Sequence, residues 1–97
     1  MSWQEKLGDL FSATVNQQSL EEAAEIMVSV SEDDIEYHKE CVSVLEKAIH
    51  SCGNGSIDAI SEINRSGYQV NSIDAAKKLL EDFLGIYLKE YELSQEG

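Results

Sequence analysis

The sequence predicts an all-α fold, a small bundle of four or five helices with short connections, and three observations support this prediction. Apolar residues recur at intervals of three and four along most of the chain, which is the period of an amphipathic helix. No segment alternates apolar and polar residues between hairpin turns, so no strand is predicted. The chain of 97 residues has the length of one domain. We therefore expect a single helical domain over residues 1–97, with a frayed tail at about 93–97.

The first two helices are expected over residues 3–14 and 20–29, with a turn at residues 15–18 between them. Proline is absent, so serine supplies most of the start signals. Each helix follows a serine that has a glutamate three residues further along, which is the spacing of a capping box. These pairs are Ser2 with Glu5 and Ser19 with Glu22.

A long third helix is expected over residues 32–52. Ser31 is predicted to be its N-cap, because a hydroxyl followed by three carboxylates suits the free N–H groups and the positive end of a helix. Gly53-Asn54-Gly55 is expected to end the helix, since glycine and asparagine accept the left-handed conformation. One apolar stripe is predicted to face the core, and it consists of Ile35, His38, Cys41, Val42, Leu45, Ala48, Ile49 and Cys52.

Two more helices are expected in the C-terminal part of the chain. A short fourth helix follows Ser56 and closes at Ser66-Gly67, a glycine-containing helix end. A fifth helix is expected over residues 73–91, with Asn71 or Ser72 as its cap. Because the connections are short, the two long helices, the third and the fifth, are expected to be antiparallel neighbours.

The charge of the chain excludes several partners. The sequence has 19 Asp and Glu residues and 7 Lys and Arg residues, which gives a formal net charge of −12 at pH 7. Without a basic patch, the chain has no electrostatic attraction for nucleic-acid phosphates or for anionic lipids, so neither is expected as a partner. No window is long and apolar enough for a membrane span, and the acidic start is unlike a signal peptide, so a cytoplasmic protein is expected.

No motif for catalysis or for cofactor binding is present. His38 shares the apolar stripe and is predicted to be a partly buried structural residue, while His50 is expected to interact with the C-terminal end of its helix. Cys41 and Cys52, on one helix, would lie roughly 16 Å apart, too far for a disulfide, so both are expected to be reduced thiols, with Cys52 partly exposed. The histidines and cysteines also lack the spacing of a zinc site. We expect a protein that is not an enzyme and needs no cofactor or metal.

The predicted interaction site is a ridge of carboxylates on the second and third helices. When the apolar stripe of the third helix faces inward, its outward and flanking positions carry acids and one tyrosine. The predicted site residues are Asp33, Glu36, Tyr37, Glu40, Glu21, Glu22 and Glu25. Solubility and helix capping explain part of this charge without any partner. A basic partner protein would explain the excess, because like charges repel one another unless something offsets them.

Three segments carry a resemblance to a known family. They are LGDLFSATVNQQSLEEAAEIM as an opening helix pair, SVSEDDIEYHKECVSVLEKAI as the start of a long helix, and INRSGYQVNSIDAAKKLLEDFL as a link into the last helix. Their order resembles that of the small helical immunity proteins of bacterial contact-dependent growth inhibition systems, over about residues 7–90. The resemblance implies a cytosolic, non-catalytic protein, alone or in a one-to-one complex, that binds one cognate toxin domain and blocks its activity, commonly that of a basic nuclease.

Two other functions remain open from the sequence. An acidic mimic of nucleic acid, acting against a host defence nuclease, would use the same carboxylates but space them like phosphates along one face. A helical adaptor or dimerisation module would expose an apolar stripe, expected on the last helix. A second aromatic patch, Tyr68 with Tyr87 and Tyr91, is predicted to belong to the edge of the core.

Overall fold

Five helices make up the described part of the chain, and no strand occurs in it. The computed structural model describes residues 3–12, 19–65 and 69–96. The helices are α1 (Trp3–Leu10), α2 (Leu20–Ser31), α3 (Ile35–Gly53), α4 (Asp58–Arg65) and α5 (Ile73–Glu96). The prediction of a small all-α bundle is therefore confirmed. None of these helices is both long and apolar enough to cross a membrane.

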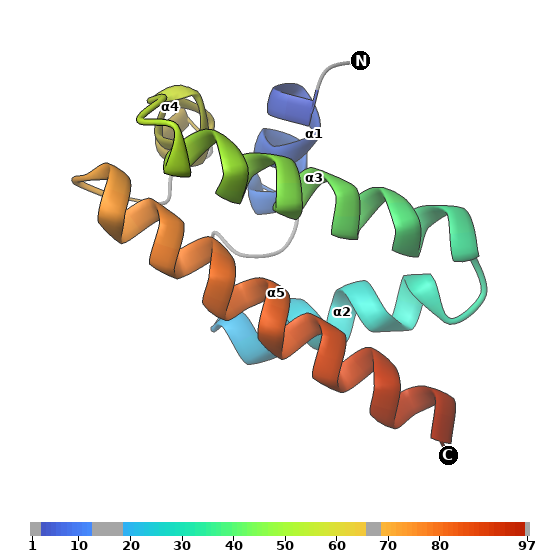
Figure 1. Cartoon of the computed structure of the whole chain (residues 1–97). Helices are drawn as coiled ribbons and strands as arrows, with labels where there is room; N and C mark the ends of the chain where they lie inside the picture. The colour runs from blue at the N-terminus through green and yellow to red at the C-terminus, as the bar shows by residue number, and fades with distance from the viewer. Residues whose placement is uncertain (1–2, 13–18, 66–68, 97) are drawn as a thin grey trace.

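The two long helices form the frame of the bundle. α3 and α5 pack against each other and run in opposite directions, as expected (Figure 1). α5 has 24 residues, about 36 Å at 1.5 Å per residue, and so spans nearly the whole 39 Å length of the molecule. α2 packs mainly against α5, while α1 packs against α3 and α4. The turn between α2 and α3 and the C-terminal end of α5 lie at one end of the molecule, and α4 lies at the other (Figure 1).

The core is one apolar cluster to which all five helices contribute. Phe11, just after α1, meets Phe83 of α5 edge to face, with ring centroids 6.0 Å apart and an interplanar angle of 81°. Side chains without solvent exposure include Leu7, Met27, Leu45, Ile63, Leu80 and Tyr87. Burying a large apolar side chain contributes about 1.5–3 kcal/mol, so this cluster stabilises the packing of an otherwise self-repelling, acidic chain.

The buried face of α3 differs from the predicted stripe at its N-terminal end, and the expected exposure of Cys52 is also wrong. Ile35 is 52% exposed, because it lies about 120° around the helix from the buried Cys41 at 100° per residue. Cys52 was expected to be partly exposed but is only 3% exposed, since eleven residues are close to three whole turns and return it to the face of Cys41. Both cysteines are free thiols, as predicted.

The boundary between α2 and α3 also differs from the prediction. Ser31 is not the N-cap of the long helix but the last residue of α2, and its Oγ donates to the carbonyl oxygen of Met27 at 2.8 Å. Asp34 is the N-cap of α3, and its Oδ1 accepts from the backbone N–H of Tyr37 at 3.1 Å. The hydroxyl of Ser31 also lies 2.7 Å from that of Tyr87 in the interior. Because this contact holds Ser31 in the core, α2 extends further than expected and α3 starts later.

Other helix signals are confirmed. The Oγ of Ser19 accepts from the backbone N–H of Glu22 at 3.2 Å, and the Oγ of Ser72 accepts from that of Ala75 at 3.1 Å. Gly55, which follows the end of α3, has a φ of 82°, in the left-handed region that glycine tolerates. The signals predicted at Ser2, at residues 13–18 and at residues 66–68 lie outside the described residues.

α5 extends beyond its predicted end. The expected helix stops at residue 91 with a frayed tail from residue 93, whereas α5 continues to Glu96. Within this extension, Ser94 Oγ donates to the carbonyl oxygen of Tyr91 at 2.7 Å. No glycine or proline interrupts the chain between residues 86 and 96, and Leu93 lies beside α2. The continued helix and its contact with α2 explain why this segment does not fray.

Candidate interaction surface

The seven residues predicted to form one carboxylate ridge lie on different faces of the molecule. The six acids are exposed, whereas Tyr37 is half-buried. Glu25 on α2 faces the C-terminal part of α5, while Glu36 and Glu40 on α3 face α1. Two separate hollows therefore divide the predicted set. The acids that line neither hollow are Glu21, Glu22 and Asp33.

The hollow between α2 and α5, which we call the acidic hollow, is lined by three carboxylates. Its residues are Glu25, Val28, Ser29, Glu32, Glu90, Leu93 and Ser94, and its volume is about 510 Å³. None of these lining residues is basic. Within the described part of the chain, Glu25, Glu32 and Glu90 form no ion pair. A cation that enters the acidic hollow would therefore meet uncompensated negative charge.

Helical spacing explains how the acidic hollow forms. Glu25 and Ser29 of α2 and its C-cap Glu32 follow each other at intervals of four and three, so they share one flank beside the buried face of α2. Glu90 and Leu93 are three residues apart on α5 and lie on the flank that meets them. The sequence prediction included Glu25 but missed Glu32 and Glu90. One sequence feature could have indicated Glu90. The segment after Gly85 has no helix-breaking residue, so α5 continues far enough to bring Glu90 beside α2.

The hollow between α1 and α3, which we call the mixed hollow, carries charges of both signs. Its residues are Trp3, Lys6, Glu36, Lys39, Glu40, Ser43, Val44 and Lys47. The Nζ of Lys6 lies 2.8 Å from the Oε2 of Glu40. Three ammonium groups therefore surround two carboxylates, and the part of the predicted ridge formed by Glu36 and Glu40 has little net attraction for a basic partner.

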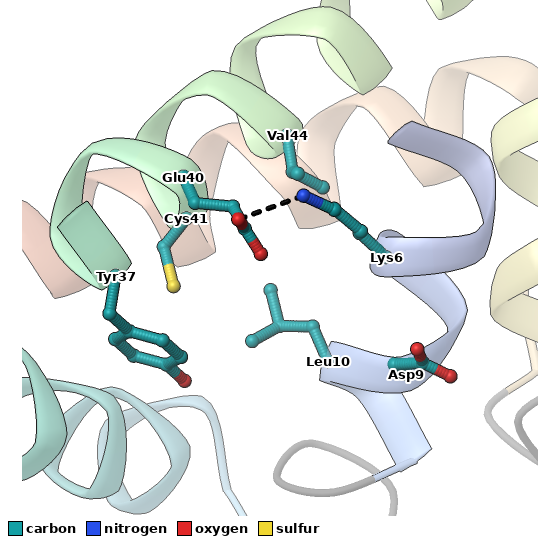
Figure 2. A pocket seen from close by; sticks show the side chains of 7 residues that line it. All are labelled: Lys6, Asp9, Leu10, Tyr37, Glu40, Cys41 and Val44. Atoms are coloured by element: carbon teal, nitrogen blue, oxygen red, sulfur yellow. Dashed lines mark ion pairs between the residues drawn. The ribbon is translucent and has the colours of Figure 1, made fainter. Parts of the chain in front are cut away.

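A smaller pocket adjoins the mixed hollow and explains the position of Tyr37. The α1–α3 pocket has a volume of about 270 Å³ and is lined by Lys6, Asp9, Leu10, Tyr37, Glu40, Cys41 and Val44. Figure 2 shows the side chains of Leu10, Tyr37 and Cys41 converging on one space, with the Lys6–Glu40 ion pair at its edge. Burial and the neighbouring Cys41 thiol raise the pKa of the Tyr37 hydroxyl above its usual range. Tyr37 is thus a wall of this pocket and not an exposed anchor.

His38 belongs to a hydrogen-bonded network that ties α3 and α2 to α5. Its Nδ1 lies 2.7 Å from the hydroxyl of Tyr87, which lies 2.7 Å from the Oγ of Ser31. The ring of His38 also stacks on Tyr91, with centroids 3.8 Å apart and an interplanar angle of 12°. His38 is therefore partnered and half-buried, as predicted. Tyr87 is fully buried within the core, Tyr91 is half-buried and packs against the core, and Tyr68 lies outside the described residues.

The direction of the hydrogen bonds in this network follows from counting protons. The single hydroxyl proton of Ser31 goes to the carbonyl oxygen of Met27, so Ser31 can only accept from Tyr87. The Tyr87 oxygen then accepts from the Nδ1–H of His38. Burial lowers the pKa of His38 below its ordinary value of 6.5, which favours the neutral ring. The proton of this neutral ring is on Nδ1, because the Tyr87 oxygen can only accept there. Burial raises the pKa of Tyr87 to about 12, so its hydroxyl stays protonated.

The described residues offer little for covalent or metal chemistry. Among them, no group of three or more His, Cys, Asp and Glu side chains could hold a metal ion. Burial raises the pKa of the Cys41 thiol to about 11 and also raises that of Cys52. Both thiols are therefore protonated near neutral pH, which makes them poor nucleophiles.

Comparison with protein-family models, with curated proteins and with solved structures finds no match to this chain.

Proposed function

We propose that this chain is an immunity protein that binds and neutralises a cognate bacterial toxin domain, a basic nuclease, through the acidic surface around the acidic hollow. The observation that carries the proposal is the contrast in charge between the acidic hollow and the mixed hollow. Glu25, Glu32 and Glu90 line one concave site with no basic residue among its lining residues. The choice of a toxin as the partner rests on the resemblance to immunity proteins.

Long-range attraction supports a basic partner. A chain with a net charge of −12 attracts a cationic protein from a distance and accelerates its association, an effect that salt weakens. Nucleases carry positive charge where they hold phosphate groups. Carboxylates that approach this positive site can occupy or cover it, so inhibition needs no catalytic residue on this chain.

The acidic hollow also has an apolar contact to offer. Leu93 is 52% exposed and shares the hollow with Val28 and the three carboxylates. An apolar side chain amid polar groups is the usual arrangement of a protein interface, where the apolar contact contributes affinity and the surrounding charges contribute specificity. This arrangement favours a protein partner over a small cation.

The proposal is tested by co-expressing the chain with the toxin domain that we expect to be encoded immediately upstream of its gene. We expect growth to be rescued and the two proteins to purify together, with less complex as salt is raised. Absence of rescue together with absence of a complex would contradict the proposal.

A charge-reversed variant tests the site. Replacing Glu25, Glu32 and Glu90 together by lysine should abolish rescue, because it changes the charge of the acidic hollow from three negative to three positive groups. The matched control carries Glu46→Lys, Glu81→Lys and Asp82→Lys, three exposed acids outside this hollow. This control changes the net charge equally and should keep most of the rescue. Equal loss in both variants would show that net charge, and not the acidic hollow, matters.

A further inference from the structure

We propose that the α1–α3 pocket holds one uncharged aromatic side chain of the toxin partner, such as that of a phenylalanine, as an apolar anchor separate from the acidic hollow. This inference rests on the proposed function for the identity of the partner, but the chemistry of the pocket can be tested without it. The charge of the acidic hollow attracts the partner, and the ring in the pocket then slows its dissociation.

The charged residues of the pocket offer no unpaired charge to a ligand inside it. The Nζ of Lys6 lies 2.8 Å from the Oε2 of Glu40, so these two side chains compensate each other at the edge. Asp9 is the third charged residue of the lining. Its carboxylate points away from the space between Leu10 and Tyr37 (Figure 2). A charged group in this space would lose its hydration without gaining a partner, so the pocket favours an uncharged group.

The interior of the pocket is apolar and has one aromatic wall. Leu10 and Val44 bring aliphatic groups to it, and Tyr37 brings a ring (Figure 2). Burial raises the pKa of the Cys41 thiol to about 11, so Cys41 stays protonated and acts as a small apolar side chain. Two aromatic rings attract each other beyond their burial when they meet edge to face or offset. A ligand ring would therefore gain a contact with Tyr37 in addition to its aliphatic contacts.

The volume of the pocket suits one ring. A closed apolar cavity of about 150 Å³ binds benzene. The α1–α3 pocket has about 270 Å³, which leaves room for one ring and the carbon that carries it. The ion pair at its edge is open to solvent, with 32% of the Lys6 side chain and 50% of the Glu40 side chain exposed. A side chain can therefore enter past this edge while its backbone stays outside, which favours a protein side chain over a free molecule.

One partner can contact both the pocket and the acidic hollow, because the turn between α2 and α3 separates them. Glu32, the C-cap of α2, lines the acidic hollow, and Tyr37, in the first turn of α3, lines the pocket. A typical stable interface covers about 800 Å² on each partner, a patch roughly 28 Å across. The molecule measures 23 and 21 Å in its two shorter directions. An interface of typical size at this end of the bundle therefore reaches both places.

The pocket is tested first with toluene, an analogue of the phenylalanine side chain, titrated into the labelled protein and followed by NMR. The matched probe is N-methylpyridinium, which has the same shape and a positive charge. Salt at about 0.15 M reduces the general attraction of the acidic chain for this cation. We expect saturable shifts centred on Leu10, Tyr37 and Val44 with toluene, and binding roughly tenfold weaker with N-methylpyridinium. Equal or tighter binding of the cation, or no saturable shifts with toluene, would overturn the inference.

Two methionine variants separate the pocket from the rest of the core. Cys41→Met extends a side chain of the pocket lining and should weaken toluene binding about tenfold, because it fills the space. Cys52→Met makes the same change at a buried position of α3 outside this lining and should leave binding within about twofold. Equal weakening in both variants would overturn the inference.

An enlarged pocket gives an independent check that does not depend on filling the core. Leu10→Ala removes a half-buried side chain from the lining. It should raise the affinity for 3-methylindole relative to that for toluene about threefold, because the wider space admits the larger ring. An unchanged ratio would show that the probes bind outside the pocket.

The complex with the toxin domain then tests the occupant. If a toxin side chain fills the pocket, the methyl signals of Leu10 and Val44 should no longer respond to toluene in the complex. A complex in which they respond as in the free chain would overturn the occupant and leave the proposed function intact. Absence of a complex would contradict the proposed function and the occupant together, while the toluene titration of the free chain still decides on the chemistry of the pocket.

Discussion

The acidic hollow and the mixed hollow both contain carboxylates, but only the acidic hollow leaves them uncompensated. Glu25, Glu32 and Glu90 have no basic neighbour in the lining of their hollow. Glu36 and Glu40 share theirs with three lysines, one of them in an ion pair with Glu40. A count of acids along the chain therefore does not locate a binding site for a basic protein. The position of the few lysines decides which acidic face stays attractive.

The two hollows also differ in how the structure holds them. The acidic hollow depends on the packing of α2 against the C-terminal half of α5, where the His38–Tyr87–Ser31 network joins three helices. The mixed hollow depends on α1 and α3, which meet through apolar packing and the partly exposed Lys6–Glu40 ion pair. Substitutions that weaken the packing beside the acidic hollow should therefore change the free energy of unfolding more than substitutions beside the mixed hollow.

The largest effect on stability is expected for Tyr87→Phe. This change removes the hydroxyl between His38 and Ser31, and it leaves the Nδ1–H of His38 without an acceptor. We expect the free energy of unfolding to fall by about 2 kcal/mol, measured by urea denaturation. Hydrogen exchange should accelerate more in α2 and the end of α5 than in α1 and α4. Tyr91→Phe keeps the ring stacked on His38 and is the matched control. An equal loss of unfolding free energy in both variants would show that the His38–Tyr87–Ser31 network does not stabilise this side of the bundle.

A smaller effect on stability is expected from a change of pH, and it acts through His38 on the same side of the bundle as the acidic hollow. Burial lowers the pKa of folded His38 below the 6.5 of an exposed histidine. As the pH falls below about 6.5, the unfolded chain takes up a proton at this position before the folded chain does. The free energy of unfolding should therefore fall as the pH is lowered from about 6.5 to the pKa of the folded state, and it should rise again as the pH is raised through the same window. His38→Gln should abolish this part of the pH dependence in urea unfolding, and an unchanged slope would contradict the assignment.

The smallest effect on stability is expected for Gly8→Ala in α1, on the side of the bundle that holds the mixed hollow. A Cβ atom at this position would lie 2.8 Å from the Oε2 of Glu62, the far end of a flexible side chain on α4. Moving that side chain costs energy, while alanine favours the helix over glycine by roughly 0.5–1 kcal/mol. We expect the two terms to offset each other within about 0.5 kcal/mol in thermal or urea unfolding. A loss above about 2 kcal/mol would mean that Glu62 fixes the packing of α1 on α4.

Much of the fold could be predicted from local sequence signals. The helix type and number, the serine caps at residues 19 and 72 and the glycine at the end of α3 all follow from short-range rules, and the structure confirms them. Ser31 shows the limit of these rules. It has the sequence context of an N-cap, but a contact with Tyr87, 56 residues away, places its hydroxyl in the core. No local pattern contains that information.

The candidate site was less predictable for the same reason. Helical spacing correctly placed six acids on the surface, but it could not show that Lys6 of α1 pairs with Glu40 of α3. It also could not show that Glu90 lies beside Glu25, because the two residues are far apart in sequence and meet only when α5 packs on α2. Exposure is a property of one helix, whereas charge compensation is a property of helix pairs.

The central claim, that the acidic hollow attracts the partner, is tested most directly by the association rate with the cognate toxin domain at low salt. Glu25→Lys with Glu90→Lys should slow association about tenfold, because both changes fall in the uncompensated hollow. Glu36→Lys with Glu46→Lys changes the net charge equally on exposed positions of α3 and should slow it less than about threefold. An equal slowing by both pairs, or a larger slowing by the second, would contradict the account.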